Sequence, residues 1–264
     1  MRKETPTIAS LSRSHATLEA MIADGGERSV TAIARELGIP VATAHRQVAS
    51  LAAEGYLARL SDGRHIAGPA LLRLARRIDE RQLIARVAAP VLVELADRLG
   101  SVAQLGTLDN DMVTYRIKVG LGAGALFTRV GLQLEAYCSG IGKTLLAHLG
   151  TRDLAAYLAT GPFVALTDRT IVDPDALHGA LDAVRSAGHA RDDGEMVAGL
   201  YCLAAPIRAA DGGVPAAISV SSADDGASQP QRLDAVLAAA AQISERIGAH
   251  GLGLGLGHAG RQAN

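Results

Sequence analysis

Apolar positions between residues 10 and 67 are spaced as three helices followed by a short hairpin. An apolar stripe at helical spacing covers residues 10–26, and a polar cap precedes a second helix over residues 29–37. Pro40 suits the first position of a third helix, over residues 41–54, because its missing N–H would be unpaired there. Asp62-Gly63 separates residues 56–60 from residues 64–67 and is typical of a tight turn between two strands. This order of elements predicts a winged helix-turn-helix.

Beyond Pro69 the pattern changes to a mixture of helices and strands. A long helical stretch begins at Pro69 and runs to about residue 100, and we expect Pro90 to split it. Alternating apolar positions predict strands over residues 102–108, 112–119, 203–208 and 216–221, the first two joined by a turn at Asp109-Asn110-Asp111. Helices are predicted over residues 141–149, 151–159, 174–187 and 230–248, a loop over 120–124, and a strand or short helix over 126–130. The predicted fold class is α+β, with an antiparallel sheet flanked by helices behind the winged helix-turn-helix.

These elements divide the chain into four predicted parts. Residues 1–68 form the winged helix-turn-helix domain, residues 69–86 a linker helix, and residues 87–248 a larger second domain. Residues 249–264 include a repeated Gly-Leu pattern of low complexity and are predicted to be a disordered tail. A chain of 264 residues that is 48% hydrophobic is long enough to bury the cores of two domains.

The net charge of −1 conceals a division of charge along the chain. Residues 1–86 hold 13 Lys and Arg against 9 Asp and Glu, whereas residues 87–264 hold 13 against 18. A basic N-terminal part joined to an acidic remainder is expected when one domain alone contacts phosphate.

The composition gives no sign of a metal, a cofactor or a membrane segment. Cys138 and Cys202 form no CxxC pair, and no histidine cluster stands at zinc-finger spacing. The polar start lacks the apolar core of a signal peptide, and no apolar run approaches the about 20 residues needed to span a bilayer. We therefore expect a soluble cytoplasmic protein without a cofactor or a membrane partner.

The predicted third helix has one apolar and one polar face. Ala44, Val48 and Leu51 share a stripe that is expected to pack on the preceding helices. The other face carries hydrogen-bond donors, namely Thr43, Arg46, Gln47 and Ser50. Arginine can bind the guanine edge and glutamine the adenine edge in the major groove, and the hairpin adds candidate phosphate or minor-groove contacts at Arg59, Arg64 and His65. These features predict binding of double-stranded DNA, although the same pattern also fits a three-helix module with a solvated polar face.

Eight stretches of the chain, in this order and spacing, resemble the IclR family of transcriptional regulators. The N-terminal stretches are residues 10–13, 31–40, 43–46 and 51–57, and the C-terminal ones are residues 137–147, 192–193, 199–207 and 217–221. The sequence departs from the family pattern at Val41-Ala42, where members usually carry Lys-Ser or similar, and at Ala32, which is often Glu. The first departure leaves fewer polar groups at the tip of the recognition helix, which affects which bases are read.

The resemblance implies a GAF-like effector-binding domain, homodimers formed mainly through the N-terminal domains, and often homotetramers. It places an effector pocket among Gly140, Ile141, Asp192, Cys202, Ser219 and Ser221. Backbone N–H groups at the start of a helix at Gly140 suit a carboxylate, and Ser219 and Ser221 point to the same side of a strand. Leu126, Phe127 and Val130 are candidates for an apolar lid. Taken singly, the serines also fit ordinary strand positions and Cys202 fits a core position.

The predicted function is that of a transcription regulator, with repression favoured over activation, whose operator binding responds to a small organic or aromatic acid. The alternative is a DNA-binding or oligomerisation module whose C-terminal domain binds no effector. Gly142-Lys143-Thr144 resembles the end of a phosphate-binding loop, but Tyr137 stands where the motif needs its first Gly. A Cys202 nucleophile assisted by His189 and Asp192 would rest on sequence proximity alone. We therefore predict no enzyme activity.

Overall fold

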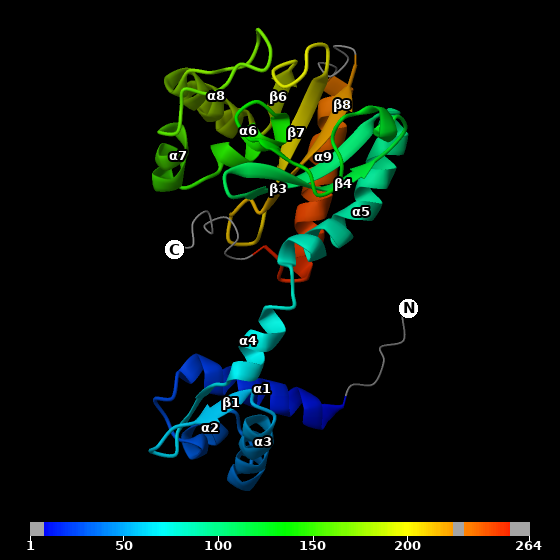
Figure 1. Cartoon of the computed structure of the whole chain (residues 1–264). Coiled ribbons are helices and arrows are strands. Elements are labelled where there is room, and N and C mark those ends of the chain that lie inside the picture. Colours follow the sequence, from blue (N-terminus) through cyan, green and yellow to red (C-terminus); the bar gives the residue numbers. More distant parts are fainter. Residues whose placement is uncertain (1–7, 224–229, 254–264) are drawn as a thin grey trace. The chain divides into compact units, whose positions relative to one another are not determined.

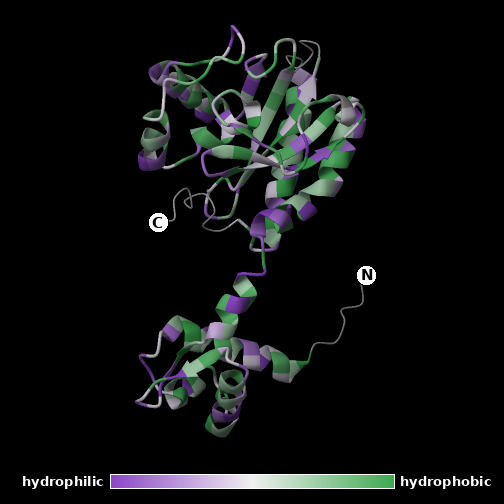
Figure 2. Ribbon diagram, in the orientation of Figure 1, coloured by the Kyte–Doolittle hydropathy of each residue, from purple (hydrophilic) through white to green (hydrophobic). Residues whose placement is uncertain are grey.

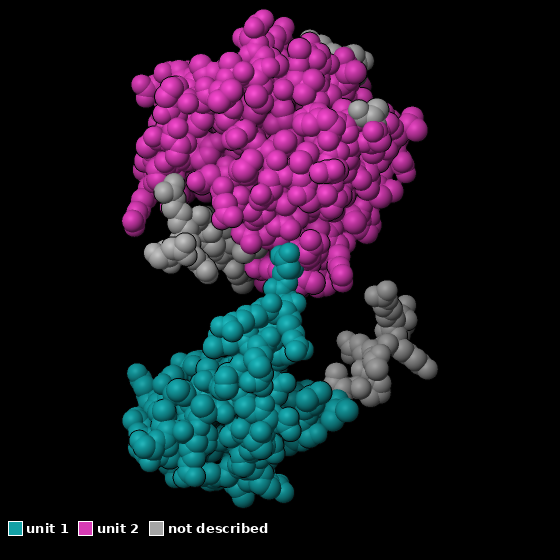
Figure 3. Space-filling model, viewed as in Figure 1, with its two compact units in different colours: residues 1–79 teal, residues 80–264 magenta. Residues whose placement is uncertain are grey.

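The computed structural model describes residues 8–223 and 230–253. The chain forms two compact units, residues 1–79 and residues 80–264, which are coloured separately in Figure 3. Helices of both units carry hydrophobic and hydrophilic positions side by side, as Figure 2 shows. The predicted α+β class, with its winged helix-turn-helix and antiparallel sheet flanked by helices, is confirmed.

The first unit is a winged helix-turn-helix. It comprises α1 (Ala9–Asp24), α2 (Val30–Glu36), α3 (Val41–Ala53), the antiparallel strands β1 (Leu57–Arg59) and β2 (His65–Ala67), and α4 (Pro69–Ala75). The Ser29 side chain caps α2 by accepting from the Ala32 N–H, and Gly38 takes the left-handed backbone conformation (φ +64°) in the turn before α3. Pro40 is the N-cap of α3 and not, as predicted, its first helical residue; that residue is Val41. Met21, Ile33 and Val48 are among the side chains that form the core of the first unit.

The predicted linker helix is interrupted, and the interruption is not at Pro90. Helix α4 ends at Ala75, and the second unit begins with α5 (Glu80–Leu99). Helix α4 packs only lightly, and Leu72, Leu74 and Ile78 stay exposed, so burial stabilises no continuation past Ala75. Pro90 lies inside α5 on its exposed side, where the Arg86 carbonyl that loses its helical partner can bond to water.

A six-stranded antiparallel sheet organises the second unit in the order β5-β4-β3-β8-β7-β6. Its strands are β3 (Val102–Asp109), β4 (Met112–Val119), β5 (Gln133–Glu135), β6 (Ala190–Asp193), β7 (Tyr201–Ile207) and β8 (Ala216–Ser222). Asn110 and Asp111, both with positive φ, make the predicted turn between β3 and β4. The pattern did not predict the short strands β5 and β6. Residues 126–130, expected as a strand or short helix, are instead a loop that follows the 3-10 turn η1 (Ala123–Ala125).

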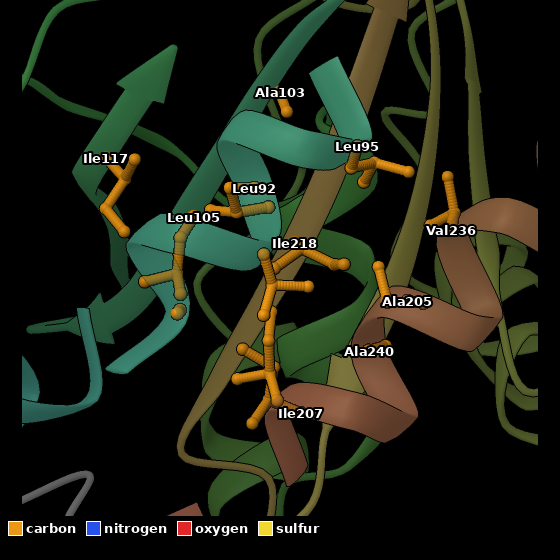
Figure 4. Packing of buried hydrophobic residues seen from close by; sticks show 14 of the residues in the cluster. Leu92, Leu95, Ala103, Leu105, Ile117, Ala205, Ile207, Ile218, Val236 and Ala240 are labelled. Atoms are coloured by element: carbon orange, nitrogen blue, oxygen red, sulfur yellow. The ribbon is translucent and has the colours of Figure 1, made fainter. Parts of the chain in front are cut away.

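Helices cover both faces of this sheet (Figure 1). Helices α5 and α9 (Pro230–Ala249) pack on one face, where the side chains labelled in Figure 4 interlock, Leu92, Leu105 and Ile218 among them. Helix α6 (Gly140–Ala147) lies on the other face, with α8 (Pro174–Ala187) packed on α6 and α7 (Thr151–Leu158) on α8. The sheet thus separates two apolar cores, and its α6 face also carries a row of polar side chains.

Part of the predicted disordered tail is ordered. Leu252 packs on the core between α5 and α9, and the Gly253 N–H donates to Glu80 Oε1 at 2.5 Å. The prediction for residues 254–264 lies outside the described residues.

Candidate functional site

Helix α3 presents its polar face as the sequence predicts, with one exception. Arg46 and Ser50 are exposed and Thr43 is partly exposed. Gln47 is partly buried, because its Oε1 accepts a hydrogen bond of 2.8 Å from the buried Thr17 hydroxyl of α1. Gln47 therefore ties α3 to α1 through the oxygen that base reading would also require.

An ion-pair network joins the end of α1 to the end of α2. The Arg28 guanidinium contacts Asp24 Oδ1 at 2.5 Å and Glu36 Oε2 at 2.6 Å, bridging the end of α1 and the end of α2. Hydrogen bonds to Arg28 hold the pKa of Asp24 below its usual value. This network orients the helix pair that carries α3.

The three predicted wing residues have different surroundings. Arg59 is exposed on β1. Arg64 is also exposed, but its guanidinium pairs with Asp62 at 2.6 Å and donates to the Glu27 carbonyl at 3.2 Å. The structure does not place His65 on the surface: its side chain is buried, and burial lowers its imidazole pKa. His65 is turned inward although the adjacent Arg64 is exposed, so the His65 side chain is not available for phosphate contact.

In the second unit, two rows of side chains cross the sheet beneath α6. Asp192, Cys202 and Ser221 stand opposite one another on β6, β7 and β8. In the neighbouring row Ser219 of β8 stands opposite Gln104 of β3. Paired positions point to the same face of a sheet, so five polar side chains from four strands converge there.

These side chains line a cavity that is partly open to solvent. Its lining includes eight of the nine predicted pocket residues, namely Leu126, Phe127, Gly140, Ile141, Asp192, Cys202, Ser219 and Ser221. Val130 is the exception, since it is 60% exposed and does not line the cavity. The loop turns away at that point, because the Gly131 N–H donates to the Tyr115 carbonyl beside it.

Helix α6 brings its N-terminus to the cavity. Ser139 caps the helix by accepting from the Gly142 N–H at 3.0 Å, and Gly140 and Ile141 follow in its first turn. A Cβ atom at Gly140 would lie only 3.2 Å from Ala204 Cβ and 3.6 Å from Cys202 Cβ, so glycine lets the helix start approach β7 closely. First-turn N–H groups at a helix N-terminus attract anions.

Known proteins share both units. A family model described as "IclR helix-turn-helix domain" matches residues 10–61, and one described as "Bacterial transcriptional regulator IclR C-terminal" matches residues 75–247. This chain belongs to the IclR family of transcriptional regulators.

Individual IclR relatives match over most of the chain. The HTH-type transcriptional regulator BhcR of Paracoccus denitrificans is 34% identical over 204 residues, 76% of this chain and 73% of that protein. The transcriptional repressor IclR of Escherichia coli is 28% identical over 213 residues, 77% of this chain and 76% of that protein. An IclR homolog from Microbacterium hydrocarbonoxydans, solved in complex with 4-hydroxybenzoate, has a TM-score of 0.60 and 27% identity and covers 91% of this chain and 100% of that one.

The ionisable side chains near the cavity of this IclR-family regulator are buried. Burial raises the pKa of the Asp192 carboxyl, although Oδ1 of Asp192 accepts from the Glu195 N–H at 2.8 Å. Lys143 is buried in an ion pair with Glu195. No cationic side chain lines the described part of the cavity, so an acid would be met by backbone N–H groups and neutral donors.

The two enzyme readings of these residues are not supported by the geometry. Lys143, the lysine of the partial phosphate-loop motif, is held in an ion pair with Glu195. Burial raises the pKa of the Cys202 thiol to about 12, so the thiolate needed for nucleophilic attack is not formed near neutral pH. The Nδ1 of His189 instead contacts the Ala187 carbonyl at 3.1 Å. The IclR family is one of transcription regulators rather than enzymes.

Six residues that line the cavity were not predicted from the sequence, namely Gln104, Tyr115, Thr128, Ser139, Met196 and Leu200. Gln104 carried a usable signal, since it is the polar residue in the otherwise apolar run 102–106. Thr128, Met196 and Leu200 lie in loops, where the sequence has no periodicity to assign a direction.

Within residues 8–223 and 230–253, no helix combines the length and apolar character needed to cross a membrane. The same residues contain no group of three or more His, Cys, Asp or Glu side chains arranged to hold a metal ion.

Proposed function

We propose that this IclR-family regulator is a repressor whose operator affinity is set by a small organic acid bound in the cavity of the second unit. The observation that carries the proposal is the convergence of the α6 N-terminus with Asp192, Cys202, Ser219 and Ser221 on apolar walls. Such a site can bind a carboxylate through N–H groups and the remaining carbon skeleton through apolar contacts. Repression follows the relative named as a transcriptional repressor, and an aromatic acid is supported by the relative solved with 4-hydroxybenzoate.

The DNA-binding step is assigned to a dimer. Two α3 helices would enter successive major grooves about one helical turn apart. Leu72, Leu74 and Ile78 are 63%, 46% and 59% exposed, and we assign these apolar side chains to contact with a second copy of the chain. The protein would act in the cytoplasm, on a double-stranded operator.

The acid would control this step by favouring one arrangement of the protein over another. It can shift the equilibrium only through its different affinities for the DNA-competent and DNA-incompetent states. The start of α5 would take part in the coupling, because Arg81 contacts Asp109 of β3 at 2.8 Å and Glu80 accepts a hydrogen bond from the Gly253 N–H. These residues follow directly after the first unit in the chain.

A thermal-shift screen against small carboxylic and aromatic acids tests the proposal, because a ligand that binds only the native state raises the melting temperature. For an acid that binds, Asp192→Ala and Ser219→Ala are expected to abolish the response while leaving DNA affinity intact. Arg152→Ala, a change at an exposed side chain of α7, is the control. Unaltered acid binding in both pocket variants by calorimetry would remove these residues from the site. Absence of binding by every acid would favour the alternative, an oligomerisation domain without an effector.

A further inference from the structure

Gln104 is a buried polar residue that the proposed carboxylate site does not use. It is 3% exposed, lies in the middle of β3 and lines the cavity. Gln104 stands opposite Ser219 of β8 on one side and Lys118 of β4 on the other, so the three side chains share one face of the sheet.

Two hydrogen bonds fix the orientation of the Gln104 side-chain amide. Its Nε2 donates to Thr128 Oγ1 at 2.6 Å, and its Oε1 accepts from Ser221 Oγ at 3.5 Å. A glutamine amide has two N–H donors and two acceptor lone pairs. The described side chains thus engage one donor and one acceptor position, and one of each remains for a group in the cavity.

The loop above the cavity is itself fixed. Lys118 Nζ donates to the Leu126 carbonyl at 2.8 Å and also to the Thr128 carbonyl. Thr128 is 6% exposed, and this loop contributes Leu126 and Phe127 to the cavity wall. Lys118 therefore positions Thr128, and Thr128 positions Gln104.

Gln104 lies on a different strand from the one that Gly140 packs against, although Ile141, the next residue of α6, lies over Gly106 of β3. Gly140 sits over Cys202 and Ala204 of β7, whereas Gln104 belongs to β3, two strands away across β8. The backbones of β7 and β3 are two strand spacings apart, about 9–10 Å, and the Gln104 side chain reaches back to Ser221 of β8 between them. A ligand with one ring, or a chain of similar length, can place its carboxylate at α6 and a second group at Gln104.

We propose that Gln104 selects the effector by hydrogen-bonding a second, neutral polar group of the acid. The preferred class is a small acid with a hydroxyl or carbonyl group at the end opposite its carboxylate. Thr128 is a positioning residue for this contact. This inference rests on the proposed acid-binding function and specifies which acids the site takes.

Matched pairs of acids test the inference on the full-length protein. Calorimetry compares 4-hydroxybenzoate with benzoate, and 6-hydroxyhexanoate with hexanoate. The hydroxy acid of at least one pair is expected to bind about tenfold or more tightly than its partner, the effect of one well-placed hydrogen bond in a buried site. Gln104→Leu and Thr128→Val are expected to abolish that preference while the plain acid still binds.

Gln133→Leu is the matched control. Gln133 Nε2 also donates to a threonine, Thr114 Oγ1 at 3.0 Å, but Gln133 is exposed on β5 and does not line the cavity. This variant should keep the wild-type preference. Should Gln104→Leu not fold, the isosteric Thr128→Val variant decides alone.

The outcomes separate this inference from the proposed function. If the plain acids bind but the wild type shows no preference, or if the variants keep it, the role of Gln104 is overturned and acid sensing stands. If no acid of either pair binds, both proposals are overturned for this class of ligand.

Discussion

Arg46 and Gln47 are neighbours on α3 with different surroundings. Arg46 is exposed, whereas Gln47 is held by the Thr17 hydroxyl. We expect Arg46→Ala to lower specific DNA affinity by about 1–3 kcal/mol and to relax the preference at one base pair, the effect of losing a bidentate contact to guanine. Competition binding with singly substituted operators measures both quantities.

Arg246→Ala provides the matched control for that experiment. Arg246 is an exposed arginine in the last turn of α9, in the second unit. Its loss removes the same charge without touching α3, so operator affinity should stay close to wild type. Equal effects of the two substitutions would mean that α3 is not the recognition helix.

His65 makes the stability of the first unit depend on pH. Its imidazole is buried, and burial lowers the folded-state pKa below the ordinary 6.5. As pH falls below 6.5, the unfolded chain binds a proton that the folded unit does not bind, so the free energy of unfolding falls. Native-state hydrogen exchange of amides in α1–α3, at about pH 7.5 and about pH 5.5, should show lower protection at the acidic pH. Equal protection in the wild type and in a His65→Gln variant at both pH values would contradict this account.

At the scale of single residues, the sequence predicted which residues lie at the site better than it predicted which way their side chains point. Together with its resemblance to the IclR family, the sequence identified eight residues that line the cavity; six of them follow from the resemblance, and strand alternation supports only the shared face of Ser219 and Ser221. It misplaced His65, because β2 has only three residues and a one-residue error in register reverses the side. It also left the engagement of Gln47 by Thr17 unseen, since that hydrogen bond joins residues 30 positions apart.

Among the elements, α6 depends on the close approach of its first turn to Ala136. A Cβ atom at Gly142 would lie 2.0 Å from the Ala136 carbonyl oxygen, so Gly142→Ala must displace the helix. We expect the second unit to lose about 1–3 kcal/mol of stability or more, together with its affinity for acids, because the helix start forms part of the cavity. Thermal unfolding followed by acid titration measures both effects.

Gly150→Ala is the control for that substitution. Gly150 is the N-cap of α7, and no atom lies within 4 Å of a Cβ built there. This variant should keep wild-type stability and acid binding to within about 0.5 kcal/mol. A Gly142→Ala protein that is as stable as Gly150→Ala would show that the approach of α6 to Ala136 is not required.

Long periodic elements were predictable and short ones were not. Helices α8 and α9 and the β3–β4 hairpin follow from their repeating patterns and from turn residues that tolerate positive φ. Strands β5 and β6 have three and four residues, too few for an alternation to stand out. The break before α5 was missed because it depends on how little α4 packs, which local propensity does not show.

For the whole molecule, the division of charge agrees with the division into units. The basic excess falls within residues 1–86, which contain the winged helix-turn-helix, and the acidic excess falls within the part that forms the cavity. Two separate domains could be predicted from the sequence because each unit carries its own apolar core. We therefore predict attraction to phosphate for the first unit and propose acid binding for the second.

The salt dependence of DNA binding tests the central claim most directly. Fluorescence anisotropy would follow the full-length protein on a duplex that it selects from a random-sequence pool, between about 50 and 200 mM salt. The account predicts that log affinity falls linearly with log salt at about −0.9 per phosphate neutralised, a loss of about 10³-fold for roughly six contacts. If no duplex is selected, or if the affinity does not change with salt, the first unit is not a DNA-binding domain and the regulator account is wrong.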